Sequence, residues 1–434
     1  MSLRFASADD LTWSSDERIA LEHANPRFGA VLADHMAVAT WQAGEGWGDD
    51  AVVNYHGLDI NPGSAVLHYA QEIFEGLKAY RHADGSIWLF RPDQNGERFV
   101  RSAKRLALPT LRVEDFVTAC MRLVEVDSRW VPEPGEGGEK SLYLRPFMIA
   151  YQDFLGLAAA STVLFSVIGS PVGAYFVSGV KPLRLLVERR QARTAPGGTG
   201  EAKCGGNYAA SLRSQIDAKT RGCNEVLFVD AVEHRWIEEL GGMNFMAISK
   251  DGQLVTPELA GTILRGVTRR SILEVAPDLG LEPVERKIDV DELLDGVRSG
   301  EFPEVFACGT AAVVTPIGSF LDGDTDVKVS EPTGKTTMEI RRRLLDIQFG
   351  RAEDTRGWLK RVCLRRRRPL GPAPMICSRL GYDGVDDNVL RLEGLPDGER
   401  VGHGILGPRN GVGGVGEQGG QWLACDNAVA GANS

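Results

Sequence analysis

The sequence predicts a mixed α/β (α+β) protein of two domains, followed by a separate C-terminal segment. The chain has 434 residues, which is more than one hydrophobic core usually supports. Strand-like apolar runs and amphipathic helical segments are interleaved as far as about residue 362. Beyond that point the apolar periodicity ends. We therefore expect two folded domains and a tail of different character.

The N-terminal domain is expected over residues 1–172, and its clearest helix covers 113–126. In that stretch apolar side chains recur at i, i+3, i+4 and i+7, the spacing of one helix face. Long apolar runs predict buried strands at 141–151 and 162–169. The segment SPVGAYF, residues 170–176, places proline and glycine between strand-like runs and is the predicted interdomain linker.

The second domain is expected over residues 177–362, with strands at 183–188, 225–230 and 243–249. A helix should begin just after Gly266, because apolar residues with helical spacing follow it. A further helix should open at Thr336, since Glu339 stands three residues later in the spacing of a capping box, and should end at Gly350.

Residues 363–434 are expected to form a disordered tail. The run CLRRRRPLGPAPM is basic and contains proline, and glycine is dense after it. Such a segment buries too little apolar surface to offset the entropy of ordering it. Two interpretations stay open: an extension without function, and a regulatory or interaction tail.

Composition excludes several classes of protein. The net charge of −10 disfavours a general nucleic-acid binder. The N-terminus lacks the apolar stretch of a secretory signal, and no apolar run is long enough for a membrane span. The seven cysteines are scattered without a CxxC pair, and the histidines lack metal-binding spacing. We therefore expect a cytoplasmic protein that binds no metal, no membrane and no nucleic acid.

The most unusual segment surrounds Lys203, in APGGTGEAKCGGNYAASLRSQ at 195–215. Glycine lets the backbone approach a ligand closely, and a lysine held there can condense with an aldehyde cofactor. A lone lysine in a glycine-rich loop is more often a surface residue, so the spacing alone leaves both interpretations open.

Three other segments are candidates for a site, although each has an ordinary structural interpretation. RWIEELGGMNFMAI, at 235–248, ends an apolar run with two adjacent glutamates. The helix start at 266–268 offers free amides that suit a phosphate. ACGTAAVVTP, at 307–316, is a turn of small residues rich in backbone donors.

Together and in this order, these segments resemble the fold type IV pyridoxal-phosphate aminotransferases, and most closely the branched-chain amino-acid aminotransferase family. The resemblance covers about residues 20–362. It includes HYAQEIFEGLKAY, LFRPDQNGERFVRSAKRL, LYLRP, PVGAYF, AKCGGNYAASL, EELGGMNFM, LRGVTRRSI and CGTAAVVTP. The fold that it implies has a smaller N-terminal α/β domain, a larger domain with a β-rich core, and the site between them.

The resemblance implies a role for each residue that would hold pyridoxal 5′-phosphate. Lys203 is expected to carry the cofactor as a Schiff base and then to move a proton between the substrate α-carbon and the cofactor. Tyr208 would hydrogen-bond the phenolic oxygen. Glu239 would pair with the pyridine nitrogen; Glu238 is the weaker choice, because the family's glutamate stands one residue before the pattern x-G-x-x-N.

The resemblance also implies a phosphate site at the backbone amides of Val267 and Thr268. Thr310 and Arg98 would add contacts to it. Arg98 is preferred to Arg101 because it aligns with the arginine of the R-x-x-R-S-A pattern.

Substrate recognition must serve an aliphatic side chain and the distal carboxylate of glutamate in turn. The resemblance implies an apolar pocket with Tyr69, Phe74 and Tyr143, and it places Arg145 where a bidentate pair with that carboxylate is possible. The substrate α-carboxylate would rest on backbone amides of the turn formed by Thr310, Ala311 and Ala312.

The implied reaction is reversible transfer of the amino group of leucine, isoleucine or valine to 2-oxoglutarate. The family usually forms homodimers in which the partner chain completes the pocket, so we expect at least a dimer. The alternatives within the fold are a D-amino-acid aminotransferase and an aminodeoxychorismate lyase, against which LYLRP and the FEG block argue. A non-catalytic relative that keeps the scaffold is the alternative from another class.

Overall fold

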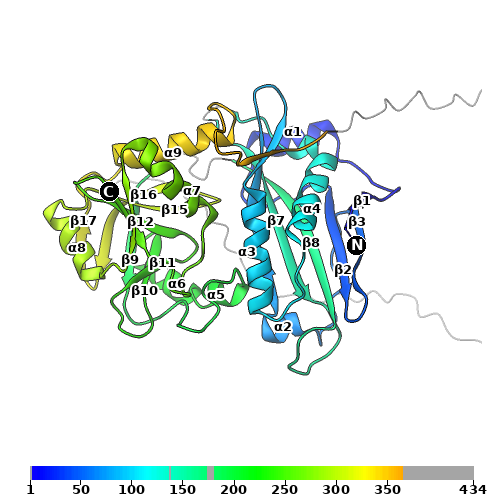
Figure 1. Ribbon diagram of the computed structural model, residues 1–434, viewed down its shortest axis with the longest axis horizontal. Coiled ribbons are helices and arrows are strands. Elements are labelled where there is room, and N and C mark those ends of the chain that lie inside the picture. Colours follow the sequence, from blue (N-terminus) through cyan, green and yellow to red (C-terminus); the bar gives the residue numbers. More distant parts are fainter. Residues whose placement is uncertain (1, 136–137, 174–179, 365–434) are drawn as a thin grey trace, which may run out of the picture. The chain divides into compact units, whose positions relative to one another are not determined.

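The computed structural model describes residues 2–135, 138–173 and 180–364, which belong to one compact unit. Two nine-stranded sheets dominate this unit (Figure 1). In the described residues, no helix is long and apolar enough to cross a membrane.

The first sheet is built mainly by the N-terminal half of the chain. Its strands follow the spatial order β1-β3-β2-β8-β7-β5-β6-β18, and β4 pairs beside β7. They are β1 (Ala6–Ser7), β2 (His35–Gln42), β3 (Gly46–Asn54), β4 (Glu72–Phe74), β5 (Leu77–Arg81), β6 (Ile87–Phe90), β7 (Ser141–Ala150), β8 (Thr162–Val172) and β18 (Leu359–Arg361). The associated helices are α1 (Asp16–Ala24), α2 (Ala65–Tyr69), α3 (Pro92–Arg105), α4 (Val113–Val126) and the 3₁₀ turn η1 (Ser128–Trp130).

Helices α3 and α4 pack on this sheet through aromatic side chains (Figure 1). Phe99 of α3 and Phe116 of α4 are fully buried and meet Phe165 of β8, with ring centroids 5.6 and 6.4 Å from it. This contact fixes α3 against the sheet, and α3 carries three side chains of the candidate site.

The second sheet is built by the C-terminal half, in the order β11-β10-β9-β16-β15-β12-β13-β14, with β17 beside β16. Its strands are β9 (Leu183–Glu188), β10 (Glu225–Val229), β11 (Ile237–Leu240), β12 (Asn244–Ile248), β13 (Gln253–Pro257), β14 (Glu282–Arg286), β15 (Glu304–Gly309), β16 (Val313–Asp322) and β17 (Thr325–Lys328). The helices are α5 (Gly205–Ala209), α6 (Leu212–Thr220), α7 (Val267–Val275), the 3₁₀ turn η2 (Ala276–Leu279), α8 (Val290–Ser299) and α9 (Lys335–Gln348).

The predicted elements with strong periodicity are confirmed. Helix α4 has the predicted bounds 113–126, and β9 has the predicted bounds 183–188. Strands β7, β10 and β12 fall within one residue of their predicted ranges at each end, and β8 extends three residues past the predicted 169. Helix α7 begins at Val267, directly after Gly266 as predicted.

The predicted capping box at Thr336 is wrong. Gly334 occupies the N-cap of α9, and Thr336 lies inside the first turn without a capping role. The free amides are bonded instead by Glu304, which accepts from Thr336 N at 3.0 Å and Thr337 N at 2.6 Å. A carboxylate at a helix N-terminus satisfies both the unpaired amides and the helix dipole.

The predicted boundaries between segments are only partly described. Residues 170–172 of the predicted linker continue β8, whereas 174–179 lie outside the described residues, as does the predicted tail from 365 onward. The division into two domains therefore stays a prediction. Strand β18 pairs with β6, so the last described strand joins the first sheet, and not the second.

Candidate functional site

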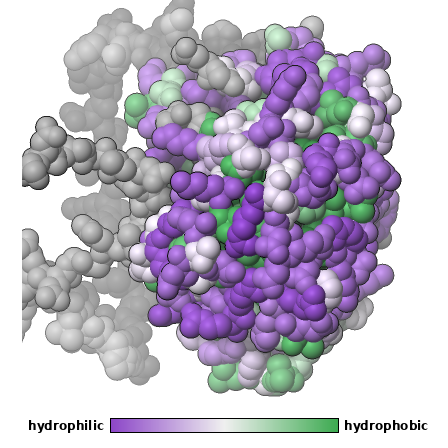
Figure 2. Space-filling model, turned by 90° about the vertical axis from the view of Figure 1, so that its left-hand side faces the viewer, coloured by the Kyte–Doolittle hydropathy of each residue, from purple (hydrophilic) through white to green (hydrophobic). Residues whose placement is uncertain are grey.

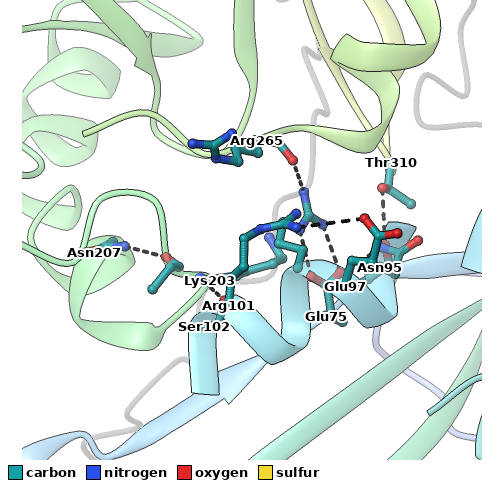
Figure 3. Close-up of polar contacts among 12 residues, drawn as sticks. Glu75, Asn95, Glu97, Arg101, Ser102, Lys203, Asn207, Arg265 and Thr310 are labelled. Atoms are coloured by element: carbon teal, nitrogen blue, oxygen red, sulfur yellow. Dashed lines mark hydrogen bonds and ion pairs between the residues drawn. The ribbon is translucent and has the colours of Figure 1, made fainter. Parts of the chain in front are cut away.

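Lys203 lies where the two halves of the unit meet, just before α5. Its backbone N–H donates to Ser102 Oγ of α3 at 2.9 Å, and its carbonyl accepts from Phe74 N of β4 at 3.0 Å. Its Nζ donates to the hydroxyl of Tyr208 at 2.6 Å and lies 4.7 Å from the centre of the Phe74 ring. The lysine is thus fixed at both ends by α3, β4 and α5, and Figure 3 shows its contact with Ser102.

The amine of Lys203 is less basic than a free lysine. Burial, followed by the nearby charge of Arg98, lowers the pKa of Lys203 from 10.5 to about 8, while the charge of Glu75 acts in the opposite direction. At pH 7 roughly a tenth of such an amine is neutral, compared with less than a thousandth of an ordinary lysine. The site therefore favours the nucleophilic form that condensation with an aldehyde requires.

Arg98 is held in place by Glu75, which is fully buried. Arg98 Nε and Nη2 donate to the two carboxylate oxygens at 2.7 and 2.8 Å, and Asn95 Nδ2 adds a third bond at 2.7 Å (Figure 3). Burial acts to raise the pKa of Glu75, but the charge and hydrogen bonds of Arg98 outweigh it and the pKa lies below its usual value. Arg98 Nη1 also donates to the carbonyl of Arg265 at 3.0 Å, close to the start of α7.

Glu239 occupies a second buried polar cluster, on β11. Its carboxylate accepts from Arg193, from Leu264 N at 3.1 Å and from Asn244 Nδ2 at 2.9 Å. Burial raises the pKa of Glu239, while the charge of Arg193 opposes the rise. Because side chains alternate along a strand, Glu238 points to the opposite face of β11 from Glu239. Burial raises the pKa of Glu238 to about 7, while a hydrogen bond with Thr262 acts to lower it. Of the two adjacent glutamates, Glu239 is therefore the one paired with a guanidinium.

The start of α7 is joined to Glu239 through Asn244. Asn244 Nδ2 also donates to the carbonyl of Leu264 at 3.0 Å, and a Cβ placed on Gly266 would lie only 1.9 Å from Asn244 Oδ1. Within the described part of the chain, no side chain caps this helix. The first amides of α7, at Val267 and Thr268, therefore remain available for an anion.

Tyr143, Arg145 and Phe74 form one group on β7 and β4. The Arg145 guanidinium lies 4.7 Å from the Phe74 ring centre, and its Nη2 donates to Tyr143 Oη at 3.2 Å. Tyr143 Oη packs so closely on Gly76 that a Cβ there would lie 2.1 Å away. Arg145 Nε is buried without a hydrogen-bond partner in the described residues, so the guanidinium retains an unused donor.

The turn between β15 and β16 contacts the same region through Thr310. Thr310 Oγ1 donates to the carbonyl of Gly76 at 3.2 Å, which links the turn that contains Ala311 and Ala312 to the segment between β4 and β5 (Figure 3).

Most of the predicted site residues are thus joined by contacts, but Tyr69 is not joined to the others. It lies at the end of α2, and its hydroxyl donates to the carbonyl of Leu155 at 2.5 Å. In the part of the chain that the structure describes, no hydrogen bond or ring contact connects Tyr69 to Lys203 or Phe74. Its role in the pocket stays a prediction.

Several residues of the site were not predicted, and Glu75, Arg193 and Asn244 are three of them. Glu75 stands in the FEG block and Asn244 in the ELGGMN motif, so both lie in recognised motifs without an assigned role. Arg193 has no local signal, because its partner Glu239 is 46 residues away.

Comparison with known proteins agrees with this arrangement. Residues 72–320 match the family model for class IV amino-transferases. The chain is 50% identical to a probable branched-chain-amino-acid aminotransferase of Streptomyces coelicolor, over 80% of this chain and 95% of that relative. It is 45% identical to a branched-chain-amino-acid aminotransferase of Mycobacterium tuberculosis, over 83% and 99%.

Solved structures show the same fold. The branched-chain aminotransferase of Thermoproteus uzoniensis with norvaline matches with a TM-score of 0.63 and 26% identity, over 76% of this chain and all of that one. The T.th. branched-chain enzyme complexed with N-(5′-phosphopyridoxyl)-L-glutamate matches with a TM-score of 0.60 and 28% identity, over 75% and 99%. The chain therefore belongs to the class IV aminotransferases, and within them to the branched-chain-amino-acid aminotransferase family.

Proposed function

We propose that the chain catalyses reversible transfer of the amino group of leucine, isoleucine or valine to 2-oxoglutarate, with pyridoxal 5′-phosphate as cofactor. The observation that carries the proposal is the buried amine of Lys203, which has a lowered pKa and is bonded to Tyr208. The high identity to enzymes named for this reaction and the phosphopyridoxyl-glutamate complex of the T.th. relative support it.

The residues present fit this cofactor at each of its polar ends. Lys203 would hold it covalently, and the Tyr208 hydroxyl would face its phenolic oxygen. Glu239 Oε2 accepts one bond, from Asn244, so a carboxylate oxygen has capacity left for a pyridinium N–H. The uncapped amides of Val267 and Thr268 suit the phosphate, with Arg98 and Thr310 beside them.

When bound, the cofactor supplies an electron sink that stabilises negative charge at the substrate α-carbon. The carboxylate of Glu239 would keep the ring nitrogen protonated, and Arg193 favours the ionised form of that carboxylate. Lys203, once released by the substrate amine, would take the α-proton as a general base. Its pKa of about 8 suits this task, because a base works best when its pKa is close to the working pH.

Both substrates would use one set of side chains. Phe74 and Tyr143 offer ring surface to an aliphatic chain, and Tyr69 is proposed to extend it. Arg145, with its unused Nε donor, would meet the distal carboxylate of glutamate or 2-oxoglutarate. The α-carboxylate would rest on the amides of the turn at 310–312.

We also propose that a second copy of the chain covers an apolar surface beside the site and completes the pocket. Leu67 and Tyr69 of α2 and Phe154, Leu155 and Leu157 of the loop after β7 are all exposed, Leu157 by 82%. The face that carries α8 and β17 is, in contrast, mainly hydrophilic (Figure 2). A contiguous exposed apolar group is typical of a protein interface.

Sedimentation tests the dimer. Leu157→Glu should shift the protein toward monomer, whereas Val232→Glu, at another exposed apolar position, should not. If both variants stayed fully dimeric, this interface would be contradicted.

The five described cysteines are free thiols, which supports the cytoplasmic location expected from the sequence.

The proposed reaction is tested with a panel of amino donors and 2-oxoglutarate. Wild-type protein should show a cofactor absorbance band and should transfer the amino group of leucine, isoleucine and valine. Lys203→Ala should lose the band and the activity. Arg145→Met should keep the band and the half-reaction with leucine but should lose turnover with 2-oxoglutarate. Activity with D-amino acids alone, or a wild-type protein without cofactor or amino transfer, would refute the proposal.

A further inference from the structure

The turn between β15 and β16 contains a strained residue. Val313 has φ +61°, and it is the one β-branched residue among those described that adopts a positive φ. The branched side chain disfavours this conformation strongly, so the surrounding structure must impose it. Val313 directly follows Ala311 and Ala312, on whose amides the substrate α-carboxylate is proposed to rest.

Two buried cations hold the backbone carbonyls on both sides of Val313. Lys78 Nζ, from β5, donates to the carbonyl of Ala311 at 3.0 Å. Arg341 Nη1, from α9, donates to the carbonyls of Ala312 at 2.7 Å and Val314 at 2.9 Å. Both side chains are buried, with 6% and 3% exposure. Elements far apart in the sequence thus converge on three carbonyls of one turn.

The charges of this cluster are not balanced by the contacts shown. Glu139 accepts from Arg341 Nη2 at 2.5 Å and is the acid whose charge acts on Lys78. Burial lowers the pKa of Lys78 to about 8, so the amine is still mostly protonated at pH 7. Among the residues that the structure describes, these two cations and one carboxylate leave an excess positive charge behind the turn, which is unfavourable in a protein interior unless an anion compensates for it.

The geometry of the peptide bond directs this charge to the other side of the turn. In a trans peptide the C=O and the N–H point in opposite directions. Lys78 fixes the carbonyl of Ala311, so the N–H of the same peptide, that of Ala312, points away from the cation. A cation on the carbonyl also polarises the peptide and makes its N–H a stronger donor.

We infer that Lys78 and Arg341 are positioning residues for the substrate α-carboxylate: they hold the strained turn in the form that presents its amides, and they place positive charge behind it. This inference rests on the proposed function. It adds two residues that touch neither substrate nor cofactor and act only through the backbone of the turn. A purely structural role, in which they join β5 and α9 to the hairpin, is the alternative to be tested.

The test compares two ligands of cofactor-loaded protein. 4-Methylvaleric acid has a carboxylate but no amine, and a solved T.th. relative binds it. 3-Methylbutylamine has the amine and a branched chain but no carboxylate. Dissociation constants for both are measured from the change in cofactor absorbance, in wild type, Lys78→Met and Arg341→Met. Arg342→Met is the matched control, since Arg342 lies on the same helix with its side chain 60% exposed.

Lys78→Met and Arg341→Met should each weaken binding of the acid by about fivefold to tenfold, because each removes one positive charge and one bond that hold the turn behind the carboxylate. Binding of the amine, and the absorbance spectrum, should match those of wild type and Arg342→Met. Equal weakening of both ligands would show a structural role only, and unchanged acid binding would overturn the inference.

Two further outcomes keep the test decisive. Where a methionine variant does not fold, it is replaced by Lys78→Gln or Arg341→Gln, which keeps a hydrogen-bond donor but removes the charge. These glutamine variants should also bind the acid more weakly than wild type does. Acid binding equal to that of wild type would overturn the inference. A wild-type protein that acquires no cofactor band refutes the proposed function, whereas an active wild type with insensitive variants refutes the inference alone.

Discussion

The pair of Arg193 and Glu239 allows a prediction in which stability and chemistry are coupled. Both side chains are buried, with 6% and 4% exposure, and the guanidinium is bonded directly to the carboxylate. Burial raises the pKa of Glu239, and Arg193 is the foremost influence that opposes the rise. Arg193→Met fills a similar volume without the charge, so the pKa of Glu239 should rise further.

The size of the effect depends on pH. Breaking a buried pair costs about 3–5 kcal/mol when the remaining charge stays ionised. Glu239 avoids part of that cost by taking a proton. An acid whose folded pKa lies above its unfolded value, about 4.3, contributes stability at low pH and loses it as pH rises through the folded pKa, by up to about 1.4 kcal/mol per pH unit. The deficit of the variant should therefore be small at pH 5 and should grow toward pH 8, by no more than about 1.4 kcal/mol per pH unit.

Guanidinium unfolding of cofactor-free wild type and Arg193→Met, at pH 5, 6, 7 and 8, measures this deficit. Cofactor is removed because a ligand of the native state adds its own stabilisation. The double variant Arg193→Met/Glu239→Gln is the control, since without a titrating carboxyl the growth with pH should disappear. A deficit that is constant from pH 5 to pH 8, or the same growth in the double variant, would refute the reasoning.

Gly266→Ala should weaken cofactor binding at least about tenfold, because the added Cβ would lie 1.9 Å from Asn244 Oδ1 and displace the start of α7. Absorbance titration of the cofactor measures this loss. Gly57→Ala is the control, since a Cβ at that position would have no atom within 4 Å. Glu304→Ala should lower the free energy of unfolding by about 2 kcal/mol, since it leaves the amides at the start of α9 unpaired. Equal denaturation midpoints for the variant and wild type would contradict the capping role of Glu304. Truncation after Val362, whose amide still bonds Ile87 in the first sheet, should leave transamination intact; a large loss of rate would show that the remaining segment matters.

The sequence predicted elements well where local periodicity decides the structure. Helix α4 was predicted at its observed bounds because its buried side chains, such as Phe116 and Cys120, recur at helical spacing. The start of α7 was found because Gly266 marks it. The prediction for α9 failed at Thr336 because the real cap, Glu304, lies 32 residues earlier and comes close only through folding.

The site shows the same contrast: residues in local motifs were predicted, and their distant partners were not. Lys203, Tyr208 and Glu239 were predicted through motifs; the structure joins Lys203 to Tyr208 and Phe74, and the roles of these residues stay predictions. The buried charged side chains that hold these site residues in place, such as Glu75 and Arg193, were not predicted. A charged side chain is read from sequence as exposed, because burial of a charge requires a partner. The partners of Arg98 and Arg193 lie 23 and 46 residues away, so no local pattern reveals them.

The pairing of β18 with β6 has a consequence for synthesis of the chain. The edge of β6 is completed only when residues 359–361 have left the ribosome. Translation proceeds at roughly 5–20 residues per second, so the roughly 270 intervening residues keep that edge open for roughly 15 to 50 seconds. An open strand edge is a template for pairing with other chains. Until those residues emerge, the native sheet does not yet cover the edge of the strand that lies directly before α3.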